Sequence, residues 1–236
     1  MSTSVGVVVP AYRPDPDRLR SYLCALRDTV DPATIRVELD ASAAATTPTL
    51  PDWVEVNVVH RRRGKGGAIT DGFEALSTDV LVFADADGAT PADSLATVIE
   101  SVAGHGGLAA GSRRHPAATI RSHQTLARRF LGDGFAWAAR RLLDARLYDC
   151  QCGAKAIAAP AWEAVRPHLY EPGFAWDIEL VAVTAALEYP VTEVPVTWED
   201  QPGSTVSPVR DGLAMAQGLL VARHRARPRG PTGTGR

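Results

Sequence analysis

Short apolar runs along the chain alternate with segments whose apolar residues recur every three or four positions. Five runs are rich in Val, Ile and Leu or Ala, as in strands buried within a sheet: residues 5–9, 35–39, 54–59, 80–84 and 108–111. The segments between them have helical spacing, as at Leu19, Leu23 and Leu26. This alternation predicts an α/β fold, in which a mainly parallel, doubly wound sheet carries helices on both faces.

The second half of the chain has a different pattern. Residues 122–147 form an arginine-rich segment that is predicted to be helical. Residues 154–159 are predicted to be a strand, after which Pro160 starts a helix. Residues 191–198 alternate like a half-exposed strand, and Pro195 places that strand near a sheet edge.

In the first half of the chain, Thr90 precedes Pro91 in a pattern that predicts a helix start capped by the threonine.

Composition narrows the classes of function. The 236 residues carry a formal net charge of −2, which argues against a general nucleic-acid binder. No apolar run approaches the roughly 20 residues of a membrane-spanning helix, and residues 1–4 lead directly into the first strand, so we expect no signal peptide. The three cysteines, Cys24, Cys150 and Cys152, do not form a disulfide pattern and favour a reducing cytoplasm.

The clearest chemical signal follows the fourth apolar run. Asp85 and Asp87 stand one residue apart directly after the strand, and Gly88 follows them. Open α/β sheets hold ligands at the carboxyl ends of their strands, and Mg²⁺ takes one or two carboxylates together with substrate phosphates. The pattern therefore predicts a site for Mg²⁺ or Mn²⁺, although aspartates that only cap the next turn would give the same letters.

Lys65 lies between glycines at a predicted helix start. Glycine lets a phosphate approach the backbone closely, and a helix N-terminus favours an anion. The segment 64–67 is therefore a candidate phosphate site, with a glycine-rich turn and a solvated lysine as the alternative.

Taken in order, these and further motifs resemble the family-2 glycosyltransferases, inverting enzymes of the GT-A fold. The matching segments span about residues 5 to 224, nearly the whole chain: Val9–Tyr12, Gly64–Ala68, Phe83–Gly88, Gly111–Arg113, Asp149–Lys155, Trp176–Leu180, Glu193–Val196 and Gly203–Ser204. Within the family, the chain is most similar to the dolichyl-phosphate β-glucosyltransferase group. The segments that carry this similarity are Asp85–Thr90, which contains the DXD motif (Asp85 and Asp87), the pair Arg121–Ser122, and Asp149–Gly153.

The resemblance implies roles for particular residues. It implies that Asp85 and Asp87 hold the metal and that Asp177 is a catalytic residue, which orients sugar hydroxyls or acts as a base. It places the donor against eight residues, Pro10, Ala11, Tyr12, Asp40, Lys65, Gly66, Asp85 and Ala86. It also implies that Gln151 and Glu179 contact the sugar or the metal-binding loop.

Arg113 and Arg128 are the candidates for holding the acceptor phosphate, because Arg matches phosphate oxygens with two parallel hydrogen bonds. A solvated helix face is the alternative for Arg128. Two departures from the family pattern stand out. Leu39 replaces the first of two adjacent aspartates and leaves Asp40, and Thr205 stands where relatives commonly have Lys.

We therefore expect an inverting, metal-dependent hexosyltransferase that moves a hexose, with glucose favoured, from a nucleotide sugar, with UDP-glucose favoured, to a polyprenyl or dolichyl phosphate. The alternatives are mannosyl transfer from GDP-mannose, a nucleotidyltransferase, and an inactive sugar-nucleotide binding module. We expect one domain over residues 1–226, which comprises a donor half (5–113), an acceptor half (114–208) and an amphipathic helix (209–226), followed by a disordered tail (227–236). The basic helix suggests peripheral binding to an anionic, cytoplasmic membrane face, with core packing as the alternative.

Overall fold

The computed structural model describes residues 3–40, 48–121 and 147–199. Seven strands form a central sheet in the order β3-β2-β1-β4-β7-β5-β8. Six of these strands run parallel, and β7 is antiparallel to β4 and β5. The strands are β1 (Val5–Ala11), β2 (Thr34–Asp40), β3 (Glu55–Val59), β4 (Val80–Ala84), β5 (Leu108–Ser112), β7 (Ala154–Ala158) and β8 (Val191–Pro195).

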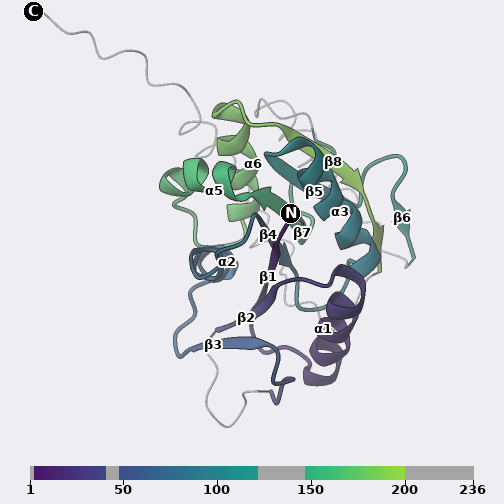
Figure 1. The fold of residues 1–236 in the computed structure, drawn as a ribbon, viewed down its shortest axis with the longest axis vertical. Helices are drawn as coiled ribbons and strands as arrows, with labels where there is room; N and C mark the ends of the chain where they lie inside the picture. Colours follow the sequence, from purple (N-terminus) through teal and green to yellow (C-terminus); the bar gives the residue numbers. More distant parts are fainter. Residues whose placement is uncertain (1–2, 41–47, 122–146, 200–236) are drawn as a thin grey trace, which may run out of the picture.

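Helices cover both faces of this sheet (Figure 1). One face packs against α1 (Pro16–Val30) and α3 (Ala92–His105), and the other packs against three helices, α2 (Lys65–Glu74), α5 (Ala159–Val165) and α6 (Trp176–Ala186). A short 3-10 helix (Arg166–His168) follows α5. The predicted α/β class, with a mainly parallel sheet and helices on both faces, is confirmed.

The local sequence explains where the elements begin and what they bury. Asp15 caps α1, because its Oδ1 accepts hydrogen bonds from the backbone N–H groups of Asp17 and Arg18 at 3.1 and 3.0 Å. All five residues of β4 are buried, as the unbroken apolar run of this strand predicts. Asp85 therefore lies at the carboxyl edge of the sheet, directly after its central strand.

Two local predictions were wrong. Thr90 does not cap α3: the residue before this helix is Pro91, and Thr90 is buried with its carbonyl accepting a hydrogen bond from the Tyr22 hydroxyl at 2.8 Å. The single strand predicted over residues 191–198 is two. β8 lies at the sheet edge, as Pro195 indicated, and Thr197–Trp198 (β9) pairs instead with Thr119–Ile120 (β6).

The segments predicted as an arginine-rich helix (122–147, apart from Leu147), a C-terminal helix and a tail lie outside the described residues. Within the described part of the chain, no helix has the length and apolar character needed to cross a membrane.

Candidate functional site

Asp85 leaves β4 in a geometry that only glycine at position 153 permits. The Asp85 backbone N–H donates to the Gly153 carbonyl at 2.9 Å. A Cβ atom on Gly153 would stand 1.9 Å from Asp85 Oδ2 and 2.2 Å from its Cγ. Any side chain at position 153 would therefore displace the Asp85 carboxylate.

Asp87 occupies the turn that follows. Its Oδ1 accepts a hydrogen bond from the Ala89 N–H at 3.0 Å. Gly88 takes a positive φ of 66°, and a Cβ added there would lie 3.2 Å from Tyr22 Cδ2. The pKa of the Asp87 carboxyl is raised, first because the surrounding protein removes part of its solvent, and second because the Asp85 charge is close. Two carboxylates thus repel each other at the end of β4.

This pair fits a divalent cation. Across residues 3–40, 48–121 and 147–199, no group of three or more His, Cys, Asp and Glu side chains has the arrangement of a metal site. A site of two carboxylates completed by substrate phosphates is nevertheless the usual arrangement for Mg²⁺, and the cation would relieve the repulsion between Asp85 and Asp87. Gly153 supplies the clearance that Asp85 needs.

Lys65 joins the two acidic motifs of the sequence. Its Nζ lies 2.9 Å from Asp85 Oδ1 and 3.0 Å from Asp177 Oδ2. Burial opposes the charge of Lys65, but the Asp177 and Asp85 carboxylates outweigh it and raise the pKa of the amine. Lys65 is therefore a fixed cation at the carboxyl edge of the sheet.

Asp177 is held by a second lysine that was absent from our candidates. Lys155 Nζ lies 2.8 Å from Asp177 Oδ1 and also donates to the Cys152 carbonyl at 2.8 Å. Burial would raise the pKa of Asp177, but Lys155 and Lys65 hold it below its usual value. The sequence carried two signals for Lys155: it is a charged residue within the apolar strand 154–158, and it ends the family-like segment Asp149–Lys155.

Two glycines let α2 pack closely against the start of α6 and the loop before it. Gly64 has a φ of 88°, and a Cβ there would lie 2.4 Å from the Pro172 carbonyl oxygen; a Cβ on Gly66 would lie 2.5 Å from Trp176 Cβ. The Gly67 N–H donates to the Pro172 carbonyl at 3.0 Å. This close packing brings Lys65 within reach of Asp177, and the buried Gly66 contributes to it.

Glu179 binds the backbone of the loop that precedes α6. Its Oε2 accepts hydrogen bonds from the backbone N–H groups of Tyr170 and Glu171 at 2.8 and 2.7 Å. The two acidic residues near the start of α6 therefore have different surroundings: Asp177 is paired with lysines, and Glu179 holds the loop that precedes its helix.

The other predicted donor residues lie at or just after the ends of β1, β2 and β4. Pro10 and Ala11 end β1, and Tyr12 follows them, with the guanidinium carbons of Arg62 and Arg13 at 4.2 and 5.3 Å from the centre of its ring. Ala86 separates the two aspartates of the metal motif.

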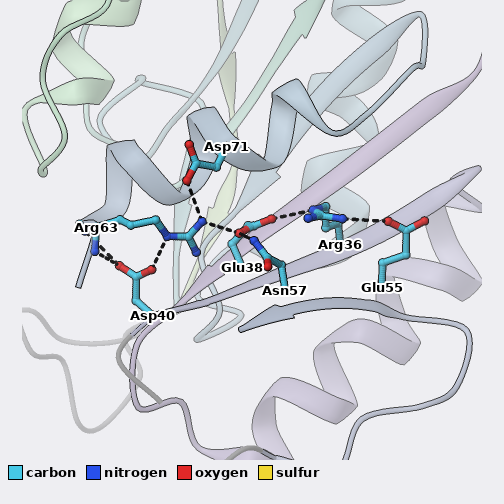
Figure 2. A network of polar contacts seen from close by, with 8 residues as sticks. Arg36, Glu38, Asp40, Glu55, Asn57, Arg63 and Asp71 are labelled. Carbon is cyan, nitrogen blue, oxygen red and sulfur yellow. Dashed lines mark hydrogen bonds and ion pairs between the residues drawn. The ribbon is translucent and has the colours of Figure 1, made fainter. Parts of the chain in front are cut away.

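Asp40, which ends β2, has protein partners on both oxygens. Oδ1 accepts from Arg63 Nε at 2.7 Å, and Oδ2 accepts from the backbone N–H groups of Arg63 and Gly64 at 2.7 and 3.0 Å. Asp40 therefore holds the loop that leads into α2 (Figure 2). Its predicted contact with the nucleotide stays a prediction.

Arg113 forms a two-pronged ion pair with a buried carboxylate. Its Nε and Nη2 lie 2.7 and 3.1 Å from the two oxygens of Asp149, and the Gln151 N–H also donates to Asp149 at 3.0 Å. Glu193 accepts the Asp149 N–H at 2.8 Å. The loop that reaches Gly153 is thus anchored on Arg113. Arg128 lies outside the described residues.

The structure thus brings Lys65, Asp85 and Asp177 together, from segments that are far apart in the sequence. Two cations and two carboxylates alternate there, as Lys155, Asp177, Lys65 and Asp85. Such an arrangement at the carboxyl ends of parallel strands can bind an anionic ligand and a cation side by side.

Comparison with known proteins supplies the family. The profile of Glycosyl transferase family 2 matches residues 6–154. Glycosyltransferase AglD of Haloferax volcanii is 31% identical over 92% of this chain and 36% of its own length. The dolichyl-phosphate beta-glucosyltransferase of Mus musculus is 31% identical over 74% of this chain and 56% of its own. The chain therefore spans about a third and just over half of these two relatives.

Solved structures agree on the fold. A crystal structure of glucosyl-3-phosphoglycerate synthase from Mycobacterium tuberculosis, in complex with Mn²⁺, UDP-glucose and phosphoglyceric acid, superposes with a TM-score of 0.68 at 16% identity and covers 94% of this chain and 80% of that one. The mostly parallel sheet flanked by helices is the GT-A fold. With the family profile matched over more than half of its length, the chain belongs to glycosyltransferase family 2.

Proposed function

We propose that this protein is an inverting, metal-dependent hexosyltransferase that moves glucose from UDP-glucose to a polyprenyl or dolichyl phosphate. The observation that carries the proposal is the joined cluster of Asp85, Lys65 and Asp177 at the carboxyl edge of the sheet. A lipid-phosphate acceptor is supported by the similarity to the mouse enzyme, whose name states that acceptor and the sugar.

On the donor side, Asp85 and Asp87 would hold Mg²⁺ or Mn²⁺ against the diphosphate. When bound, this cation supplies Lewis-acid stabilisation of the charge on the leaving group. Lys65 adds a second, permanent positive charge, because neighbouring carboxylates keep its amine protonated. Tyr12 with Pro10 and Ala11 lies at the end of the neighbouring strand, where the nucleoside would lie.

On the acceptor side, the chemistry demands little from a general base. A phosphate monoester has its second pKa near 6 and is largely a dianion at neutral pH, so its oxygen is already a nucleophile. Asp177 is a weak base, because two lysines stabilise its ionised form. We therefore assign Asp177 to holding Lys65 and orienting the sugar, and not to removing a proton.

We propose that residues 5–113 bind the donor and residues 114–208 the acceptor, except that Arg113, the last residue of the donor half, is assigned to the acceptor phosphate. Arg113 and Arg128 are the proposed phosphate ligands, although Arg113 already gives two nitrogens to Asp149. Contact with a lipid acceptor places the protein at an anionic membrane surface, where it should bind vesicles at low salt and leave them at high salt.

The test is a panel of donors and acceptors. The full chain is incubated with Mg²⁺ or Mn²⁺, with UDP-glucose, GDP-mannose and other nucleotide sugars, and with a short polyprenyl phosphate; the lipid product is detected by mass. We expect a glucosyl lipid phosphate, and none with excess chelator. A mannosyl product from GDP-mannose alone would identify the mannosyltransferase alternative.

Two further outcomes would overturn the proposal. Release of pyrophosphate from a nucleoside triphosphate and a sugar phosphate would identify a nucleotidyltransferase. Tight binding of a nucleotide sugar without transfer or hydrolysis, under conditions in which Asp85→Asn abolishes the binding, would identify a binding module.

A further inference from the structure

A buried acidic residue with no counterpart among the predicted site residues lies beneath the loop that carries Lys65. Glu38 lies on β2, the second strand from one edge of the sheet, and its side chain is 0% exposed. Gly72 of α2 lies so close above it that a Cβ there would meet Glu38 Cγ at 3.2 Å. A carboxylate this deep is costly unless charged or polar partners compensate it.

All three side-chain partners of Glu38 are hydrogen-bond donors. Its Oε1 accepts from Arg36 Nε at 2.6 Å, and its Oε2 accepts from Asn57 Nδ2 and Arg63 Nη1, both at 2.7 Å. Figure 2 shows these contacts as one continuous chain of side chains along β2. Only an ionised carboxylate offers acceptors to all three, since the amide of Gln would turn an NH₂ group toward at least one donor.

Arg63 links Glu38 to the loop that precedes α2. Its side chain is 5% exposed, its Nη1 contacts Glu38 and Asp71, and its Nε contacts Asp40. Asp40 in turn accepts the backbone N–H groups of Arg63 and Gly64. Lys65 is the next residue, so the backbone immediately before it is fixed to the sheet.

The direction of Lys65 depends on that fixed backbone. Gly64 has a φ of 88° and lies against the Pro172 carbonyl, so its position sets where α2 begins. From there the amine of Lys65 reaches Asp85 and Asp177 at 2.9 and 3.0 Å. The Lys65 side chain is 11% exposed and its amine must meet two carboxylates at once, so a shift of the backbone before it would change how well the amine can reach both.

We propose that Glu38 and Arg63 are positioning residues, which act through the Arg63–Gly64 backbone to hold the Lys65 amine against Asp85 and the donor diphosphate. This inference rests on the proposed function for its kinetic consequence. It predicts an effect on the donor side of the reaction and none on acceptor binding.

The main variant is Glu38→Gln, which keeps the shape and removes the charge. We expect kcat/KM for UDP-glucose to fall on the order of tenfold, while KM for the polyprenyl phosphate stays the same. Asp71→Asn is the matched control, because it removes a carboxylate that is 55% exposed from the same Arg63 nitrogen. Exposed ion pairs contribute little, so the control should change kcat/KM less than about threefold.

A double-mutant cycle separates positioning from general destabilisation. If Glu38 acts through Lys65, then Glu38→Gln added to Lys65→Met should cause no further loss of transfer. Losses that multiply in the double variant would overturn the proposal. A Glu38→Gln protein with a lower Tm but wild-type kcat/KM at low temperature would also overturn it, because the network would then serve the fold alone.

Hydrogen exchange tests the structural step without any substrate. In Glu38→Gln the backbone amides of Arg63 and Gly64 should exchange at least tenfold faster than in the wild type and in Asp71→Asn; unchanged exchange would refute the anchoring. If Glu38→Gln does not fold, Arg63→Lys replaces it with the same expectations, because a single ammonium cannot reach both Asp40 and Glu38 as the guanidinium does. If wild-type protein transfers no sugar, the proposed function fails, but the inference can still be tested. Hydrogen exchange at Arg63 and Gly64 and the affinity for UDP measured by calorimetry are then compared between wild type, Glu38→Gln and Asp71→Asn, and only Glu38→Gln should show faster exchange and weaker binding.

Discussion

Replacing Lys65 by Met removes the cation between the metal motif and α6 and nearly preserves the volume of the side chain. Lys65 is 11% exposed, whereas Asp177 is 3% exposed and Asp85 40%. After the change, Asp177 keeps its contact with Lys155 at 2.8 Å, and Asp85 keeps its access to water. Neither carboxylate becomes both buried and unpaired.

The size of the effect follows from these surroundings. Breaking a buried ion pair by removing one partner costs about 3–5 kcal/mol. The remaining contact with Lys155 and the exposure of Asp85 reduce this cost, so we expect a loss of about 2 kcal/mol of unfolding free energy. In a chain of this length each kcal/mol lowers Tm by about 2–4 °C, which gives a decrease of roughly 4–8 °C. Loss of a fixed charge at the leaving diphosphate should reduce transfer by about 10²–10³.

The pH dependence adds a check on the cause. The pKa of Lys65 is raised above its ordinary value in the folded protein. Its contribution to stability is therefore complete below the unfolded pKa of about 10.4 and is lost as pH rises through the higher folded pKa. The contribution of Lys65 to the difference in stability between wild type and Lys65→Met should thus be constant between about pH 6 and pH 9.

The assay combines thermal unfolding, calorimetry with UDP-glucose and metal, and initial rates of transfer. Arg61→Met is the control, because Arg61 is an exposed cation four positions earlier in the same segment. A variant with the expected loss of Tm but unchanged donor affinity and transfer would show that Lys65 is only a structural ion-pair partner. A loss of transfer as large in Arg61→Met would show that general charge, and not the position of Lys65, matters.

Three further predictions concern the metal motif and its supports. Asp85→Asn and Asp87→Asn should each abolish the binding of Mn²⁺ measured by electron paramagnetic resonance and reduce transfer by orders of magnitude; full activity in excess chelator would contradict this. Gly153→Ala should reproduce these losses in a folded protein, because its Cβ would stand 1.9 Å from a carboxylate oxygen, whereas Gly104→Ala, with no atom within 4 Å, should leave activity unchanged. Burial would raise the pKa of the Asp149 carboxyl, but the Arg113 guanidinium outweighs burial and holds this pKa well below its usual range. The stability of the wild-type protein should therefore fall as pH drops below about 4. The stability of Asp149→Asn should depend less on pH in this range, and an equal dependence would count against the ion pair.

The sequence by itself determined the elements and the position of the metal motif. The unbroken apolar run before Asp85 indicated a strand buried on both faces, and the alternation of such runs with helical spacing determined the α/β class. These features are legible because hydrophobic periodicity is local and each element must bury one face. The same reasoning failed at Thr90, which is buried with its carbonyl accepting a hydrogen bond from Tyr22, a residue distant in the sequence that local patterns do not take into account.

Only the tertiary structure decided which charges meet. Lys155 and Asp177 are far from Lys65 in the chain, and nothing local indicates that two lysines share one buried carboxylate. The order of the sheet, with the antiparallel β7 placed between β4 and β5, brings Gly153 beside Asp85. The pairing of buried charges depends on through-space distance and desolvation, which sequence spacing does not encode, so the surroundings of this site could be read only once the chain was folded.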